Sequence, residues 1–165
     1  MQDLKELYGE VITEHGKKPR NYRVMESANR RAEGHNPLCG DHLLLYLDVG
    51  DDHIKDISFQ GDGCRIFKAA SSMMTHRLKG KSRDEARALA GEFHRMIVGE
   101  LNVEGEPNQL GHLVAFSGIS NFPVRVKCAS LPWRTLEAAL EGEETATTEN
   151  LGPALTAEQA AQVAD

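Results

Sequence analysis

The chain has 165 residues and a formal net charge of −6, with 40% hydrophobic and 27% charged residues. This length and composition suit one globular domain with its own core. The acidic balance argues against a dedicated nucleic-acid-binding protein, since such a protein presents a basic surface. No apolar run approaches the roughly 18 residues of a membrane span. The N-terminus lacks a signal-peptide pattern. Together these observations predict a cytoplasmic protein.

The first predicted element is an amphipathic helix over residues 2–15, which Gly16 and Pro19 bring to an end. Residues 17–36 carry charged residues and turn formers, so they are predicted to form a long loop. This loop holds a basic cluster that is either a solvated surface or a docking surface for an acidic partner: Lys17, Lys18, Arg20, Arg23, Arg30 and Arg31.

A β-hairpin is predicted next. In residues 42–49 every second residue is apolar, which indicates a strand with one buried face. A turn at 50–52 leads to a second strand around Ile57 and Phe59, and the glycines of "GDG" at 61–63 are predicted to end it.

Helices dominate the rest of the chain. The apolar spacing predicts one helix from Arg65 to about Gly80, another from Ser82, and a third over residues 121–140. Residues 99–120 are only weakly periodic. The order of one helix, a hairpin and further helices predicts an α+β fold.

The C-terminal part has a different composition. Residues 141–155 are acidic and rich in threonine, which predicts a flexible linker, and a short helix is predicted from Thr156. The sequence therefore predicts one domain over residues 1–140 and an acidic, flexible tail over residues 141–165.

The three cysteines are the strongest chemical signal. Cys39, Cys64 and Cys128 are too few for a disulfide framework, so they are buried filler, redox groups or metal ligands. Cys39 and Asp41 precede the first hairpin strand, whereas Cys64 follows the second strand at the start of a helix. Because an antiparallel hairpin brings its outer ends together, these residues are predicted to be neighbours.

A third thiol from the C-terminal helix would complete a site with three sulfurs and one carboxylate oxygen. Four such ligands suit tetrahedral zinc, and they also suit a [2Fe–2S] cluster. Asp41 taken alone is more typical of a turn or capping residue than of a metal ligand. The seven histidines show no pair at ligand spacing, and His42 is predicted to point to the other face of its strand.

These motifs together resemble the U-type iron–sulfur cluster assembly family, which comprises IscU, SufU and the N-terminal domain of NifU. The resemblance runs from about residue 3 to residue 140. It rests on "NPLCGD", on "GDGC" followed by "AASSMMT", and on "FPVRVKCASLPW". It implies a small antiparallel sheet packed by helices, with Cys39, Asp41, Cys64 and Cys128 as site residues at one exposed end.

Within this family the chain is more similar to the SufU branch. Lys127 stands where IscU-like members carry histidine, and the 63-residue segment between Cys64 and Cys128 resembles a SufU insertion. Two departures from the family pattern are the bulk of Phe67 and Lys68 near the site, and Pro132, which is expected to kink the last helix and shift Cys128.

Three hypotheses about function follow. The first is a zinc-bound sulfur acceptor that works with a cysteine desulfurase, with Cys39 as the accepting thiol. The second is a scaffold that assembles a [2Fe–2S] cluster and passes it to downstream assembly or acceptor proteins. The third is a binding module with a purely structural zinc ion.

Overall fold

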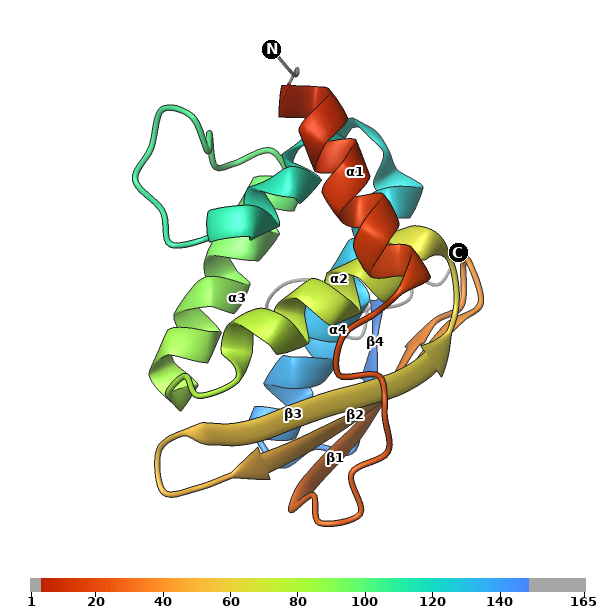
Figure 1. The fold of residues 1–165 in the computed structure, drawn as a ribbon, viewed down its shortest axis with the longest axis vertical. Helices are drawn as coiled ribbons and strands as arrows, with labels where there is room; N and C mark the ends of the chain where they lie inside the picture. The colour runs from red at the N-terminus through yellow and green to blue at the C-terminus, as the bar shows by residue number, and fades with distance from the viewer. Residues whose placement is uncertain (1–3, 149–165) are drawn as a thin grey trace, which may run out of the picture.

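The computed structural model describes residues 4–148, which form a four-stranded sheet with helices packed over one face (Figure 1). The strand order is β3-β2-β1-β4, from Ile54–Asp62, Asp41–Val49, Arg30–Asn36 and Thr145–Thr147. The first three strands are antiparallel, whereas β4 runs parallel to β1. The predicted α+β fold is confirmed.

The predicted hairpin is the pair β2 and β3. Leu43, Leu45, Leu47 and Val49 are buried on the helix-covered face, as their alternation predicts. The second strand continues through Gly61 to Asp62, so it is longer than predicted. His42 pairs with Asp62 across the ladder, and this pairing brings the two outer ends of the hairpin together.

The prediction of a loop over all of residues 17–36 is wrong at its C-terminal end, where β1 forms. The buried face of β1 carries Ala32, Gly34 and Asn36 rather than large apolar residues. A side chain at Gly34 would have its Cβ 2.1 Å from the Thr135 hydroxyl of the last helix. The close approach of that helix requires small residues here, and small residues leave no apolar alternation in the sequence.

The predicted helices are present. They are α1 (Leu4–Lys17), α2 (Arg65–Leu78), α3 (Arg83–Ile97) and α4 (Pro123–Leu140). Ser82 caps α3 with Glu85 in a reciprocal capping box. Helix α4 continues through Pro132, and Cys128 on its N-terminal half still lies beside Cys39 and Asp41.

The weakly periodic segment contains a 3₁₀ helix, η1 (Gly111–Asn121), that packs through aromatic contacts. The ring of Phe93 on α3 stacks on Trp133 of α4 at a centroid distance of 5.0 Å and meets Phe116 of η1 edge-on at 5.6 Å. These contacts join the long segment between Cys64 and Cys128 to the helical layer.

The segment after α4 returns to the sheet, so the predicted linker does not extend over residues 144–148. The Glu33 N–H donates to the Glu144 carbonyl at 2.8 Å, and the Thr148 hydroxyl donates to Asn36 at 3.1 Å. Strand β4 has only three residues and no apolar alternation, so the sequence does not indicate it. It forms because it pairs with β1, which is distant in the sequence. The short helix predicted from Thr156 lies outside the described residues. We propose that the domain extends to Thr148.

Two truncations test this boundary. Removal of residues 149–165 should leave the melting temperature unchanged, whereas removal of residues 141–165 should lower it by several degrees. The longer deletion removes β4 and the Thr148 hydrogen bond. Each lost hydrogen bond should lower the free energy of unfolding by about 1 kcal/mol. Calorimetry on both variants measures the difference in melting temperature. Equal melting temperatures would mean that the domain ends at residue 140.

Candidate metal centre

Cys39 lies in the turn between β1 and β2, at the end of the sheet. The turn closes through a hydrogen bond from the Gly40 N–H to the Asn36 carbonyl at 2.8 Å. Gly40 has φ +74°, a left-handed conformation that favours glycine. The Cys39 side chain is exposed, and Asp41 follows as the first residue of β2.

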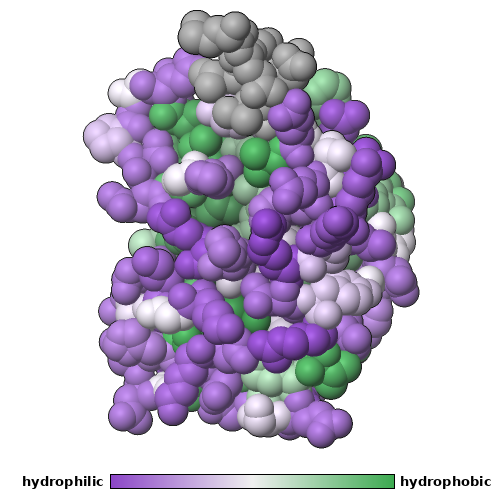
Figure 2. All heavy atoms as spheres, viewed as in Figure 1, coloured by the Kyte–Doolittle hydropathy of each residue, from purple (hydrophilic) through white to green (hydrophobic). Residues whose placement is uncertain are grey.

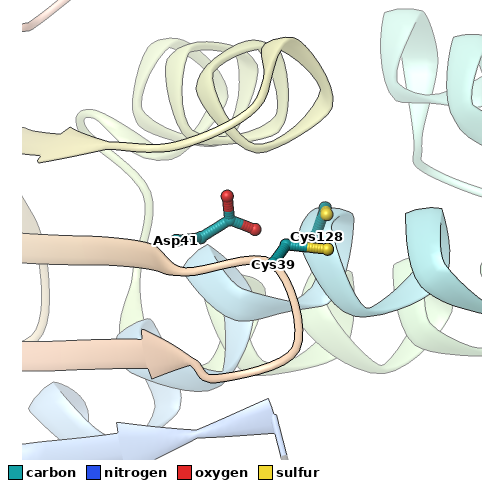
Figure 3. A group of neighbouring side chains, drawn as sticks. All are labelled: Cys39, Asp41 and Cys128. Carbon is teal, nitrogen blue, oxygen red and sulfur yellow. The ribbon is translucent and has the colours of Figure 1, made fainter.

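Helix α4 places Cys128 beside this turn. Cys128 lies 92 residues after Asn36 in the sequence. One ligand atom from each of Cys39, Asp41 and Cys128 lies within 4.8 Å of the others. Figure 3 shows the two sulfur atoms beside each other, with the Asp41 carboxylate extending from its strand toward the same space. Cys128 is buried, with 2% of its surface exposed. Two thiols and a carboxylate therefore meet between the turn and α4.

Cys64 borders this group, although its sulfur is not among the atoms within 4.8 Å. It is the N-cap residue of α2, and the Phe67 N–H donates to its sulfur at 3.4 Å. Its own N–H donates to the Asp41 carboxylate at 3.0 Å. The Cys128 thiol also hydrogen-bonds the Cys64 sulfur. All four predicted site residues thus lie at one end of the sheet.

The Asp41 carboxylate is completely buried and oriented from two sides. One oxygen accepts the Cys64 N–H, and the other accepts the Asn36 side-chain amide at 3.0 Å. Each hydrogen bond uses one lone pair of a carboxylate oxygen, so both oxygens keep acceptor capacity for a metal ion. The structural role and the ligand role of Asp41 are therefore compatible.

Asn36 is a buried site residue that sequence reasoning missed. Its amide nitrogen lies 3.0 Å from Asp41 and 3.7 Å from the Cys128 sulfur. Its amide oxygen accepts hydrogen bonds from the Leu38 N–H and the Thr148 hydroxyl. An asparagine before a proline reads as a turn former in sequence. Its role depends on contacts with β2, α4 and residue 148, which local sequence does not show.

Gly63 makes room for the carboxylate. A Cβ at this position would lie 2.3 Å from an Asp41 oxygen and 2.7 Å from the Phe67 ring. Phe67 itself is fully buried in the core, so its bulk faces the interior rather than the exposed end of the site. The glycine before Cys64 therefore serves close packing against Asp41.

The two neighbouring thiols of Cys64 and Cys128 differ in acidity. The hydrogen bond from Cys128, together with the N–H groups of Phe67 and Ile66 and against the effect of burial, lowers the pKa of Cys64 to about 7. The pKa of Cys128 is raised, chiefly by the adjacent Cys64 sulfur and then by burial. In the metal-free protein the first proton therefore leaves Cys64.

The remaining site predictions have simple outcomes. His42 lies on the outer face of β2, as predicted, where its ring is 2.5 Å from Glu33. Lys127 is half-buried, next to Cys128 on α4. Among residues 4–148, no helix has the length and apolarity to cross a membrane.

Comparison with known proteins decides the family. The family model "NifU-like N terminal domain" matches residues 7–129, a range that includes all three cysteines and Asp41. The chain belongs to the NifU-like N-terminal domain family. The sequence-based resemblance is confirmed.

Two curated relatives match most of this NifU-like chain. The iron–sulfur cluster assembly scaffold protein IscU of Streptococcus pyogenes serotype M1 is 37% identical over 141 residues, covering 86% of this chain and 87% of the relative. The zinc-dependent sulfurtransferase SufU of Bacillus subtilis (strain 168) is 37% identical over 142 residues, covering 86% and 95%.

A solved structure supports the fold of this NifU-like chain. It is a Fervidobacterium islandicum AW-1 protein described as a candidate iron–sulfur cluster assembly scaffold for the SUF system. The TM-score is 0.74 at 37% identity, and the match covers 79% of this chain and 94% of the other.

The acidity difference predicts selective alkylation of the metal-free NifU-like protein. Because the pKa of Cys64 is about 7 instead of 9.0, its thiolate is present above that pH and is lost as the pH falls through it. Iodoacetamide should modify Cys64 with a half-maximal rate near pH 7, whereas buried Cys128 should remain protected. Peptide mass spectrometry measures both rates. Equal modification of Cys128 and Cys64 at pH 7 would contradict the ordering.

Proposed function

We propose that this chain is an iron–sulfur cluster assembly protein that binds zinc and accepts sulfur from a cysteine desulfurase. Cys39, Asp41, Cys64 and Cys128 are the proposed zinc ligands. One observation carries the proposal: a ligand atom from each of Cys39, Asp41 and Cys128 lies within 4.8 Å of the other two. Cys64 lies beside them. Three sulfurs and one oxygen suit the tetrahedral coordination of zinc.

The exposure of the site favours a reactive centre over a structural one. Structural zinc sites are closed, with four protein ligands and no open position. Here Cys39 and Cys64 are exposed, and Cys39 lies on a turn rather than in a helix or strand. A partner protein can reach both sulfurs without unfolding the domain.

Two observations favour zinc and sulfur acceptance over assembly of a [2Fe–2S] cluster. Lys127 precedes Cys128 where IscU-like members carry histidine, and the long segment containing α3 and η1 resembles the SufU insertion. The Bacillus subtilis relative, which carries the name zinc-dependent sulfurtransferase, is matched over 95% of its length.

Cys39 is the proposed acceptor thiol. Bound zinc would keep the ligand cysteines as thiolates near neutral pH. The Cys39 thiolate then attacks the terminal sulfur of the desulfurase persulfide. A new S–S bond forms on Cys39, the S–S bond of the desulfurase breaks, and the desulfurase cysteine leaves as its thiolate. Cys64 and Cys128 are less suited because helices α2 and α4 fix them.

The surroundings of Cys39 support docking of the desulfurase at this end of the sheet. Leu38 is 57% exposed beside Cys39, and Val124 is 51% exposed one helical turn before Cys128. The basic cluster of residues 17–31 is a weaker candidate for docking. Arg23 pairs with Asp56, and Arg30 donates to the carbonyls at the end of α4.

Zinc analysis tests the ligand set. The protein purified without oxygen should contain one zinc ion per chain, and Cys128→Ser should lower the affinity strongly. Affinity should also fall steeply as the pH drops, because three thiols must lose protons on binding. His42→Ala is the matched control, since His42 lies on the outer face and pairs with Glu33. Unchanged affinity in Cys128→Ser would refute the four-ligand site.

The accepting thiol is tested with a cysteine desulfurase and cysteine as substrate. The wild-type chain should stimulate turnover, and Cys39→Ser should abolish the stimulation and form no persulfide. Alkylation of the persulfide followed by mass spectrometry locates the transferred sulfur. A persulfide on Cys64 or Cys128 would remove Cys39 from this role. Unstimulated turnover, combined with intact transfer of a reconstituted [2Fe–2S] cluster to an apo-ferredoxin, would favour the scaffold function.

A further inference from the structure

A basic pocket lies at the C-terminal half of α2, between α1, α2 and η1. Its volume is about 750 Å³. Arg20, Arg77, Lys79 and Lys81 line it, together with three histidines and three apolar residues. Arg77 follows Cys64 by 13 positions on α2, or about 20 Å of helix. The pocket is therefore separate from the metal centre.

The charge of this pocket is opposite to that of the whole chain. The chain has a net charge of −6, yet no carboxylate of residues 4–148 lines the pocket. Two of the cations have acidic neighbours, since Arg20 lies 3.6 Å from Glu14 and Lys79 lies 3.3 Å from Asp56. Clustered cations in a concave surface focus a positive potential and attract anions. In the view of Figure 2, hydrophilic side chains cover the middle of the molecule, where α2 crosses it.

Arg77 gives the pocket a fixed donor. One guanidinium nitrogen donates to the Gln109 carbonyl. The other terminal nitrogen packs against Gly111, so closely that a Cβ on this glycine would lie 2.6 Å from it. Its Nε is buried and has no hydrogen-bond partner among residues 4–148. The Gln109 contact and the packing against Gly111 therefore hold the Arg77 side chain in place at the wall of the pocket.

The three pocket histidines lie in the same positively charged surroundings. His15 lies 2.7 Å from the Ser72 hydroxyl and within 3.2 Å of the Arg20 guanidinium. The pKa of His15 is lowered by burial first and then by Arg20, with smaller effects of the same sign from His76 and His112 and an opposing one from Glu14. A bound anion would offset the repulsion between these groups.

The floor of the pocket is apolar. Met73, Leu110 and Leu113 line it and are almost completely buried. A cavity of this volume is in the range of small-molecule sites, which combine an apolar surface with a few polar groups. We propose that this pocket binds a small phosphate-bearing ligand of nucleotide size, with its phosphates on the arginines and lysines.

Titration of the zinc-loaded protein with ADP, pyrophosphate or adenosine tests the proposal, with the histidine signals followed by NMR. ADP and pyrophosphate should shift His15, His76 and His112 and raise the pKa of His15, while His35 on the sheet stays unchanged. Adenosine, which carries no phosphate, should not bind. Absence of shifts with millimolar ADP and pyrophosphate would overturn the proposal.

Substitutions locate the binding. Arg77→Gln should weaken ADP binding about tenfold or more, since a hydrogen bond to a charged group is lost. Lys81 and His112 also line the pocket. Lys81→Gln and His112→Gln should therefore weaken ADP binding too, and they test the proposal if Arg77→Gln disturbs η1. Arg87→Gln on α3 is the matched control and should bind normally. Equal binding by Lys81→Gln, His112→Gln and the wild type would refute this location. Shifts with a glutamate-rich peptide but not with ADP would identify a protein-docking surface instead.

Discussion

The buried Asp41 carboxylate connects the parts of the metal centre. It accepts one hydrogen bond from the Cys64 N–H, at the start of α2, and another from the Asn36 amide, at the end of β1. These bonds fix the turn that carries Cys39 relative to the helix that Cys64 caps. A buried carboxylate without such donors would be costly, so the positions of Asn36, Gly63 and Cys64 depend on it.

The close packing of α4 on β1 has a similar importance for the third thiol. Gly34 allows Thr135 and Leu131 to approach the strand backbone, and this contact positions α4 over the sheet. Cys128 lies two turns before Thr135 on the same helix, so its sulfur reaches the turn at Cys39. A side chain at Gly34 would push α4 outward and separate Cys128 from the other ligands.

The structure separates two kinds of electrostatic environment along α2. At its N-terminus, backbone N–H groups and the Cys128 thiol stabilise a thiolate on Cys64. Near its C-terminus, cations from the loop after α1, from α2 and from the connection between α2 and α3 line the basic pocket, although the chain as a whole is acidic. One helix thus presents a soft-metal site near one end and a candidate anion site near the other.

The sequence alone determined the hairpin, four helices, the family and the four candidate ligands. Those features are local patterns: alternation in β2, helical spacing in α1 to α4, and cysteines within short motifs. Only the tertiary structure decided the strands β1 and β4, whose small and polar residues carry no local signal because α4 packs so closely on β1. It also decided the role of Asn36 and the basic pocket, since each depends on side chains from segments far apart in the chain.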